Sequence, residues 1–300
     1  MNEVYAVDPA APADWKELKL LLDQFGLQTG RFVADFPLDW IDEVRAGFAR
    51  ATEIERKCAI EVLKRRRCGL TTRSGAKFLS SMPWVENAVA ATREFKCIIG
   101  CRQNGIGLPT VEDVLYDDEK ALPSGIEDHL DGRADEYARV ARPLFEASAE
   151  VILVDPFFLR ADEDRAAQRK RTVLAKLLRC AESSGTCERF LLMLELPPHG
   201  TMSRSAAEAK VDDHIRWACR EAGSQHVKVK RALREDVGHG RYLFSVDGGL
   251  HFDEGFGELR DGKKNHVTWL SQPGLAPLLK RFASHGGRTV MCSASVRAES

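Results

Sequence analysis

After Glu150 the chain alternates between apolar runs and amphipathic or charged segments, and this alternation restricts the fold more than any other feature. The run Glu150–Phe158 is continuously apolar, as is typical of a strand buried in a parallel sheet. Similar patterns predict further strands and helices, at 190–196, 226–232 and 266–271 for strands and at 165–183, 206–222 and 275–284 for helices. Strands that alternate with helices favour right-handed crossovers. We therefore expect an α/β fold with a largely parallel sheet flanked by helices.

The first of these strands ends in Asp155, and Pro156 follows it. In open α/β sheets, ligands gather beyond the carboxyl ends of the strands, which makes Asp155 a candidate site residue. An aspartate at the start of a turn also accepts hydrogen bonds from its own backbone. Both interpretations are open at the level of sequence.

A β-hairpin is predicted across 238–258, because two arms rich in aromatic and branched residues flank an Asp-Gly-Gly turn. With a two-residue loop, odd positions on the first arm face even positions on the second. Four side chains then share one face, namely His239, Arg241, Phe256 and Glu258. A three-residue loop would reverse the pairing. The prediction is a polar group of imidazole, guanidinium and carboxylate at the open end of the hairpin.

The pattern His239-x-Arg241, followed by an apolar arm, an acidic turn and a Gly-rich second arm, resembles the His-x-Lys…Asp…Gly-Ser-x-Asn pattern of the phospholipase D superfamily. Arg241 stands at the position of the lysine, Gly255-Phe256 at that of Gly-Ser, and Glu258 at that of the asparagine. The chain also resembles a bacterial branch of the superfamily that carries His-x-Arg-Tyr. The resemblance covers about residues 143–300 and implies a phospholipase D-like domain there.

In that superfamily two histidines cooperate without a metal, one as nucleophile and one as acid, and single-copy members obtain the second histidine by dimerising. The resemblance therefore implies a homodimer and catalytic roles for His239, Arg241 and Glu258, with no metal or other cofactor. Asp155 joins this expected catalytic set because of its position at the strand end. A histidine nucleophile divides one difficult step into two easier ones, and cations neutralise the charge on the phosphoryl oxygens. Arginine holds its charge and can bind phosphate bidentately, although it cannot readily share a proton.

The expected function is that of a metal-independent phosphodiesterase, a bacterial nuclease with a role in phage defence or in a mobile element by analogy alone. The alternative is a catalytically inactive module that binds nucleic acid or a protein partner. In that case Arg241 pairs with Glu254 or Glu258. Sequence alone leaves both functions open.

Residues 1–142 match no family motif and are expected to form a mainly helical accessory domain, through which a protein partner could bind. Helical spacing predicts a helix at 15–25, a second from Asp39 to Arg67 and a third after Pro83, with a short strand at 95–101. The Pro/Ala-rich segment 1–14 is expected to be poorly ordered.

The second of these helices ends in a basic cluster that Arg73 and Lys77 extend; the cluster comprises Lys64, Arg65, Arg66 and Arg67. Cations at the carboxyl end of a helix complement its dipole, so a solvated helix end is one interpretation. Contact with nucleic-acid phosphates is the other.

Composition restricts the partners and the compartment. With 44% hydrophobic residues, 30% charged residues and a formal net charge of −1, the chain lacks the bulk positive charge of an electrostatic nucleic-acid binder, although a local basic groove stays open. The sequence has no apolar run that could span a bilayer and no signal-peptide pattern. Its eight cysteines lack paired spacing, which indicates reduced thiols. We expect a cytoplasmic protein without a membrane partner.

Overall fold

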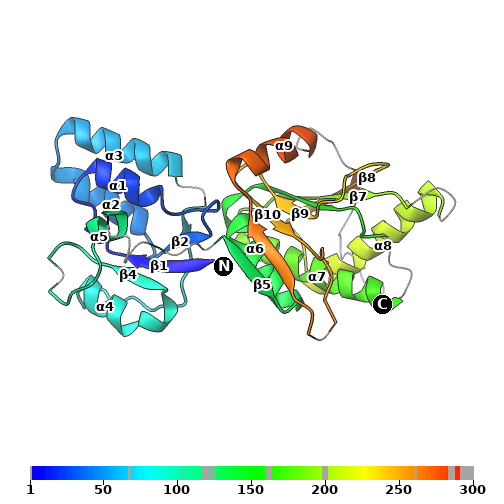
Figure 1. Cartoon of the computed structure of the whole chain (residues 1–300), viewed down its shortest axis with the longest axis horizontal. Helices are drawn as coiled ribbons and strands as arrows, with labels where there is room; N and C mark the ends of the chain where they lie inside the picture. Colours follow the sequence, from blue (N-terminus) through cyan, green and yellow to red (C-terminus); the bar gives the residue numbers. More distant parts are fainter. Residues whose placement is uncertain are drawn as a thin grey trace, which may run out of the picture. The chain divides into compact units, whose positions relative to one another are not determined.

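The computed structural model describes residues 2–66, 69–103, 105–116, 122, 126–159, 164–197, 202–260, 262–282 and 288–290; at 65–66, 164 and 288–290 it describes the backbone alone. The chain divides into two compact units, Met1–Ile126 and Glu127–Ser300 (Figure 1).

The first unit is built on a parallel sheet with the strand order β3-β2-β1-β4. Its strands are β1 (Glu3–Val7), β2 (Arg31–Ala34), β3 (Thr71–Thr72) and β4 (Cys97–Ile99). Its helices are α1 (Trp15–Leu22), α2 (Trp40–Gly47), η1 (Phe48–Arg50), α3 (Glu53–Arg66), α4 (Trp84–Ala90), η2 (Thr92–Glu94) and α5 (Val111–Tyr116). The segment expected to be a poorly ordered lead therefore contains an interior strand. The domain expected to be mainly helical over 1–142 thus contains a four-stranded parallel sheet among its helices.

Helices cover both faces of this sheet. Tyr5 and Val7 of β1 pack with the apolar residues of α1, α2, α3 and α5 on one face. Ala6 and Ile98 pack with Ala88 of α4 on the other. Alternate residues of β1 thus enter two separate cores, as the two-residue period of a strand requires.

The helix predicted from Asp39 to Arg67 is two helices, and the break lies at Phe48–Arg50. Thr52 and Glu55 form a capping box at the start of α3. The backbone N–H of Thr52 donates to Glu55 Oε2 at 3.0 Å, and the N–H of Glu55 donates to Thr52 Oγ1 at 3.3 Å. This reciprocal cap satisfies backbone donors that a continuous helix would satisfy internally, so it makes the break possible.

The second unit contains an eight-stranded mixed sheet in the order β12-β8-β7-β6-β9-β10-β11-β5. Its strands are β5 (Glu127–Leu130), β6 (Glu150–Asp155), β7 (Arg189–Glu195), β8 (Lys228–Arg234), β9 (Tyr242–Phe244), β10 (Gly249–Phe252), β11 (Asn265–Trp269) and β12 (Arg288–Val290). Its helices are α6 (Ala134–Ala147), α7 (Asp164–Ser184), α8 (Arg204–Ala222) and α9 (Gln272–Phe282). The strands β6, β7 and β8 are parallel, and β9 runs antiparallel beside β6. The expectation of an α/β fold is confirmed, but the sheet is not largely parallel: among the described residues, two of its pairings are parallel and five are antiparallel, because the hairpin, β11, β5 and β12 all join it in antiparallel register.

The boundary between the units lies earlier than the expected position at residue 142. The strand β5 pairs with β11, for example Leu130 with Asn265, although 134 positions separate these residues in the sequence. The helix α6 buries Tyr137, Leu144 and Phe145 completely, and the Phe145 ring meets that of Phe190 on β7 edge to face. These long-range contacts assign 127–142 to the second unit.

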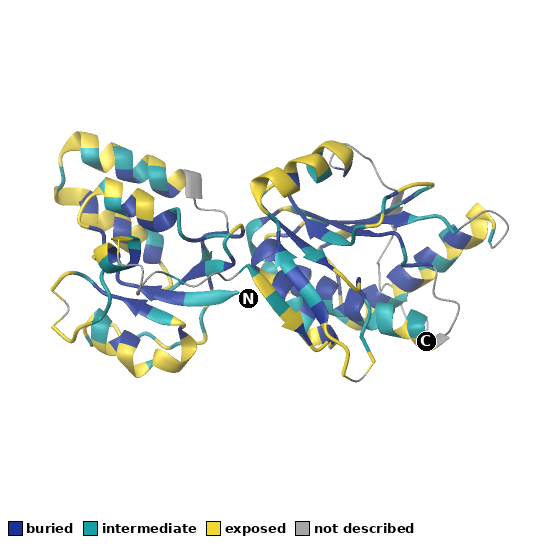
Figure 2. Cartoon of the chain, in the orientation of Figure 1, coloured by how far each residue is buried: buried dark blue, intermediate teal, exposed yellow. Residues whose placement is uncertain are grey.

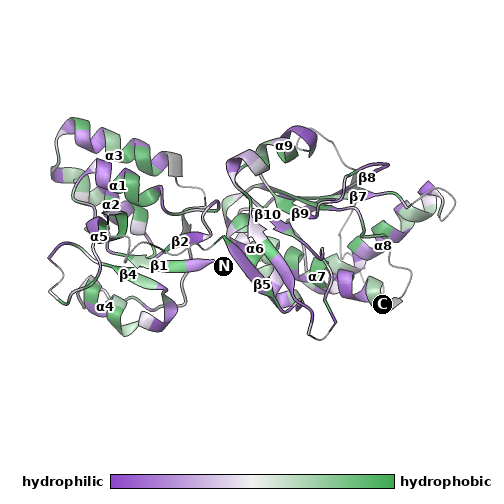
Figure 3. Cartoon of the chain, in the orientation of Figure 1, coloured by the Kyte–Doolittle hydropathy of each residue, from purple (hydrophilic) through white to green (hydrophobic). Residues whose placement is uncertain are grey.

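The central strands β6 and β7 are buried over most of their length, and the exposed residues of the helices lie on their outer faces (Figure 2). The central strands are mainly hydrophobic, and hydrophilic residues lie on the outer faces of the helices (Figure 3). On one face of the sheet, Ile152 and Val154 of β6 pack with Leu275 and Phe282 of α9. The helices α6 and α7 lie against the other face (Figure 1).

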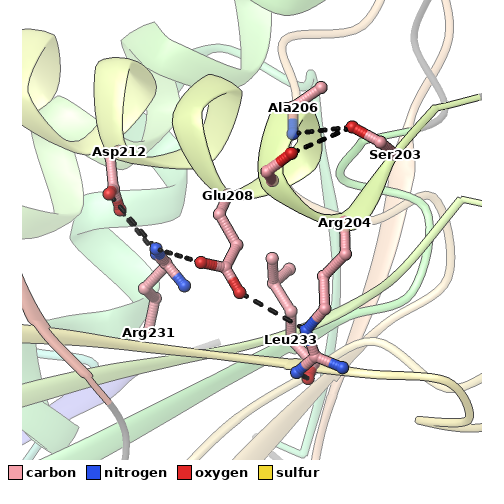
Figure 4. Close-up of polar contacts among 8 residues, drawn as sticks. Ser203, Arg204, Ala206, Glu208, Asp212, Arg231 and Leu233 are labelled. Carbon is pink, nitrogen blue, oxygen red and sulfur yellow. Dashed lines mark hydrogen bonds and ion pairs between the residues drawn. The ribbon is translucent and has the colours of Figure 1, made fainter.

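Ion pairs fasten the helix α8 to the strand β8 (Figure 4). The guanidinium of Arg231, which is 3% exposed, lies 3.2 Å from Asp212 Oδ2 and 3.4 Å from Glu208 Oε2. Glu208 also accepts a hydrogen bond from Arg204 at 3.4 Å, and Ser203 caps the helix. This network fixes the start of α8 over the carboxyl-terminal half of β8.

The thiols differ in state. Cys219 of α8 is disulfide-bonded, whereas Cys58, Cys97, Cys101, Cys180 and Cys187 are free. The expectation that all thiols are reduced is therefore wrong for Cys219. Spacing along the chain did not indicate this bond, because a disulfide depends on proximity in space.

No helix in the described part of the chain is both long enough and apolar enough to cross a bilayer.

Candidate functional site

Strand pairing brings Asp155 and Arg241 together at one edge of the second sheet. The antiparallel register of β6 and β9 pairs Ile152 with Phe244 and Val154 with Tyr242. One further step along both strands places Asp155 opposite Arg241. Two residues that are far apart in the sequence thus meet where β6 ends, the position at which α/β sheets bind ligands.

Asp155 is 1% exposed, and burial raises the pKa of its carboxyl group. The positive charge of Lys170 on α7 is the largest opposing influence, and that of Arg241 adds to it. The backbone N–H of Phe157 donates to Asp155 Oδ1 at 2.8 Å, and the N–H of Phe256 also donates to the carboxylate. Asp155 therefore does both things expected of it, because it caps its own turn and lies among the candidate site residues.

Lys170 lies beside the turn that follows β6, and its side chain is largely buried. Its ammonium group donates to the carbonyl oxygens of Phe157 and Phe158, the latter at 2.9 Å, and lies 5.6 Å from the centre of the Phe158 ring. Burial lowers the pKa of Lys170, while the charge of Asp155 raises it. The ammonium thus fixes the turn after β6 and partly neutralises the buried carboxylate.

Arg241 lies across the Phe157 ring, with its guanidinium carbon 4.5 Å from the ring centre. Its side chain donates to the carbonyl oxygen of Asp253. A Cβ atom on Gly255, where φ is +81°, would lie 2.7 Å from Arg241 Cδ. Only glycine combines that backbone conformation with this close approach. No ion pair joins Arg241 to Glu254 or Glu258 among the described residues.

His239 lies before β9 rather than within it, because the strand begins at Tyr242. Its exposed ring stacks on Phe157, with ring centres 6.4 Å apart and an interplanar angle of 18°. The same phenyl ring therefore supports the imidazole of His239 and the guanidinium of Arg241. Within the described residues, nothing donates to or accepts from the His239 ring.

The hairpin keeps the expected parity but not the expected length. Its loop spans four residues, 245–248, so that Arg241 faces Phe252 and the N–H of Phe252 donates to Arg241 O at 2.9 Å. The arms end at Tyr242 and Phe252, however, and the four-residue face predicted from the sequence does not form.

Glu258 does not join the group. Its Oε1 atom accepts from the backbone N–H of Ala134, 3.3 Å away, at the start of α6. A carboxylate at this end complements the helix dipole. In the described structure no contact joins it to His239 or Arg241, so its place at the site is corrected to a helix-capping position.

The turn at 254–257 is held by two buried residues that sequence analysis missed. Asn265 accepts from the N–H of Glu254 at 2.9 Å and donates to the carbonyl of Gly255 and to the Tyr137 hydroxyl, both at 3.0 Å. The Tyr137 hydroxyl donates to Gly257 O at 2.9 Å. Burial raises the pKa of Tyr137 to about 12. A polar pair at the start of a strand and inside a helix gave no sequence signal for this role.

A buried imidazole lies on α8. His214 is 2% exposed, accepts a hydrogen bond from Arg171 and meets the Phe158 ring edge to face at 5.8 Å. Burial and then the charges of Arg171, Lys210 and Lys170 lower the pKa of His214 to about 4. The ring is therefore neutral near pH 7 and supports the turn that carries Phe157.

Two further histidines lie beside Asp253. His251 Nδ1 is 3.4 Å from Asp253 Oδ1, and His266 Nδ1 is 3.2 Å from Asp253 Oδ2. Burial lowers the pKa of His251, Asp253 raises it, and the charge of Arg241 lowers it. The spacing of these two histidines along the chain does not indicate that they meet, because their proximity depends on the pairing of β10 with β11.

The residues expected to contact nucleic acid lie in the first unit. Lys64 is exposed and pairs with Glu61 at 3.2 Å, as a solvated helix end would. Arg73 and Lys77 are exposed. Arg67 and the side chains of Arg65 and Arg66 lie outside the described residues, so their contact with phosphate stays a prediction. Across the described ranges, no group of three or more His, Cys, Asp or Glu side chains is placed to hold a metal ion.

Comparisons with known proteins do not assign the chain to a family. No family model and no curated protein matches the chain. The archaeal chromatin protein TrmBL2, described as having a novel mode of DNA binding, aligns with a TM-score of 0.27 and 10% identity over 81% of this chain and 77% of that chain. Polyphosphate kinase from Porphyromonas gingivalis aligns with a TM-score of 0.31 and 12% identity over 74% of this chain and 34% of that chain. Similarities this weak carry no argument about function.

Proposed function

We propose that the second unit is a phospholipase D-like, metal-independent phosphodiesterase that acts on nucleic acid through His239. The observation that carries this proposal is the shared support on Phe157, whose ring contacts both the exposed imidazole of His239 and the guanidinium of Arg241. Asp155 and Lys170 lie at the same sheet edge. An exposed nucleophile beside fixed positive charge is what attack on an anionic phosphodiester requires.

In the proposed reaction a ring nitrogen of His239 forms a bond to phosphorus, and the bond from phosphorus to the leaving oxygen breaks. The leaving oxygen takes a proton from an acid and departs as an alcohol. Water then cleaves the phosphorus–nitrogen bond, which restores the imidazole and releases a phosphomonoester. Arg241 binds the phosphoryl oxygens and offsets the charge that develops on them.

In this mechanism a second imidazole serves as the acid that gives a proton to the leaving oxygen. The resemblance implies His239 of a second copy, and a symmetric homodimer is the commonest way to bring two copies together. Within one chain, His251 and its partner Asp253 supply another candidate beside Arg241. Activity from a species that light scattering shows to be a strict monomer would favour His251.

The second candidate function is an inactive binding module. It is favoured by the hydrogen bonds that the two cations of the site already make within the protein. Arg241 and Lys170 both donate to backbone carbonyls, and Asp155 offsets their charge. His239 also lacks an orienting hydrogen bond within the described residues. A module of this kind would bind an anionic partner without cleaving it.

Incubation with single- and double-stranded DNA and RNA in EDTA separates the two functions. The enzyme hypothesis predicts cleavage by the parent and cleavage near background for His239→Ala, because loss of a nucleophile costs several orders of magnitude in rate. His226→Ala is the matched control, since its side chain is 86% exposed and lies elsewhere in the same unit. A parent that binds but does not cleave supports the module. Equal cleavage by parent and His239→Ala would exclude this site.

A further inference from the structure

The first unit has a ligand cavity at the carboxyl ends of its strands. Residues that follow β1 and β2, which are neighbours in the sheet, line this cavity. In open parallel sheets with helices on both faces, ligands bind beyond the carboxyl ends of the strands.

The cavity has a volume of about 540 Å³, which is within the range of small-molecule sites. Residues that follow β1 and β2, the exposed face of α2 and the start of α4 line it; those used below are Asp8, Asp39, Glu43, Phe78 and Trp84. Among the described residues, the lining contains no lysine, arginine or histidine, so all of its charged side chains are negative.

Asp8 gives the cavity a buried acceptor. The residue is 9% exposed, and its Oδ1 atom accepts from the N–H of Ala10 at 2.9 Å. Within the described residues, its Oδ2 atom has no hydrogen-bond partner. Asp39 precedes α2 without capping it through its side chain, so its carboxylate is also available. Both carboxylates line the cavity, and a ligand that donates hydrogen bonds would pair with them.

The residues that line this cavity disfavour phosphate binding, although the topology of the sheet resembles that of nucleotide-binding sheets. The chain after β1 runs Asp8-Pro9-Ala10, whereas a phosphate loop needs glycines that let backbone N–H groups approach the anion. The positive end of the α2 dipole is offset by Asp39, Asp42 and Glu43. A nucleotide phosphate would therefore meet repulsion on every side.

Two aromatic rings supply an apolar wall. Trp84 Nε1 donates to the carbonyl of Phe36 at 3.0 Å, which fixes the indole. The Phe36 ring meets the rings of Phe78 and Trp84 edge to face, with centres 5.0 Å and 6.2 Å apart. Aromatic faces beside carboxylates attract a cation through both the ring quadrupole and charge.

We propose that this cavity binds a small organic cation, an amine or guanidine whose carbon skeleton lies against Trp84 and Phe78. Its charged group donates to Asp8 and is further neutralised by Asp39 and Glu43. This site is separate from the phosphodiesterase proposed for the second unit, and each proposal can fail without the other.

Calorimetric titration of the full chain with putrescine, agmatine and tyramine, at ionic strength matched with NaCl, tests the proposal. We expect at least one of these to bind once per chain, and AMP and inorganic phosphate not to bind at this site. Asp8→Asn keeps the acceptor for Ala10 and should weaken binding about tenfold, as loss of a charge-assisted hydrogen bond does. Thermal unfolding checks that this variant folds.

Glu43→Gln and Asp39→Asn, both at exposed positions, should each weaken binding a few-fold. Asp42→Asn is the matched control, because it removes the same charge from the same helix but lies outside the lining. Failure of all three cations to bind at millimolar concentration would overturn the proposal. Equal binding by the parent, Asp8→Asn and Asp39→Asn would overturn it as well, as would AMP binding that Asp8→Asn abolishes.

Discussion

Asp155 is the residue on which the candidate site depends most. A fully buried carboxylate is unfavourable unless nearby charges and hydrogen bonds compensate it. Lys170, Arg241 and two backbone N–H groups provide that compensation. The positive charges at the site therefore have a structural role in addition to the proposed binding of phosphate, and an experiment must separate the two.

A double-mutant cycle at Arg241 and Asp155 makes this separation. Arg241→Ala should lower the free energy of unfolding by about 2 kcal/mol, because it leaves Asp155 with one cation instead of two. In an Asp155→Asn background the same change should cost at least about 1 kcal/mol less. Urea unfolding measures both values. Additive effects would show that the two side chains do not interact.

Arg241→Lys should retain more activity than Arg241→Ala, because it keeps the charge. If the guanidinium acts on phosphate, the double variant Arg241→Ala/Asp155→Asn should be more stable than Arg241→Ala but should still not cleave nucleic acid. Recovery of both would assign Arg241 a purely structural role.

His214 should make stability depend on pH. Its folded pKa of about 4 lies below the ordinary value of 6.5, so the unfolded state binds more protons between these values. Stability should therefore be fully present above about pH 6.5 and decrease as the pH falls toward 4. His214→Gln, which can still accept from Arg171, should flatten this part of the profile in urea unfolding at pH 4.5 and 7. An unchanged profile would contradict the assignment of a neutral buried ring.

Sequence predicted some of the site residues and not others, for identifiable reasons. Asp155 and Arg241 carry local signals, a strand end and a paired motif. Lys170 is one cation in a helix with many, and only the fold shows that its ammonium turns inward to Phe158 O. Glu258 matched the motif by position, but the turn at Gly255 directs it to the start of α6.

At the scale of elements, continuous apolar runs were sufficient to locate β6 and β7, because buried parallel strands are continuous in hydrophobicity. The strand β8 has the sequence KVKRALR, and its alternation of buried and less buried residues indicates a strand instead. The strand β1 was missed because Glu3–Val7 is short and precedes a Pro/Ala-rich segment. The pairing of β9 with β6 could not be predicted, since sequence order does not specify which strand receives a hairpin. That pairing is what creates the site.

Asn265→Ala should destabilise the second unit by about 3 kcal/mol, because it leaves the buried N–H of Glu254 and the carbonyl of Gly255 without partners. It should also reduce any cleavage, since the turn at 254–257 packs against Arg241. Unfolding and cleavage assays measure these effects.

Asn87→Ala is the matched control. Asn87 is 3% exposed and makes equivalent hydrogen bonds to the backbone of Leu79 and Met82 in the first unit. Asn87→Ala should lower the free energy of unfolding by a similar amount and leave the rate of cleavage unchanged. Equal loss of cleavage in both variants would contradict a positioning role for Asn265.

At the scale of the whole molecule, the boundary at 126/127 predicts which fragment folds. Residues 127–300 should form a soluble domain with a cooperative unfolding transition. Residues 143–300 should not, because they lack β5 and most of α6, which leaves β11 as an open edge and uncovers α7. Circular dichroism and thermal unfolding of the two fragments provide the comparison. A stable 143–300 fragment would show that β5 and α6 are accessory.

The central claim is that His239 forms a bond to phosphorus, and trapping that bond tests it most directly. The parent should be incubated with phosphorus-labelled oligonucleotides in EDTA, quenched rapidly in alkali and digested for mass spectrometry. The account predicts an acid-labile phosphoramidate on His239, absent from His239→Ala and present in His226→Ala. Cleavage of the oligonucleotide by a parent that carries no adduct on His239, with equal cleavage by His239→Ala, would contradict it.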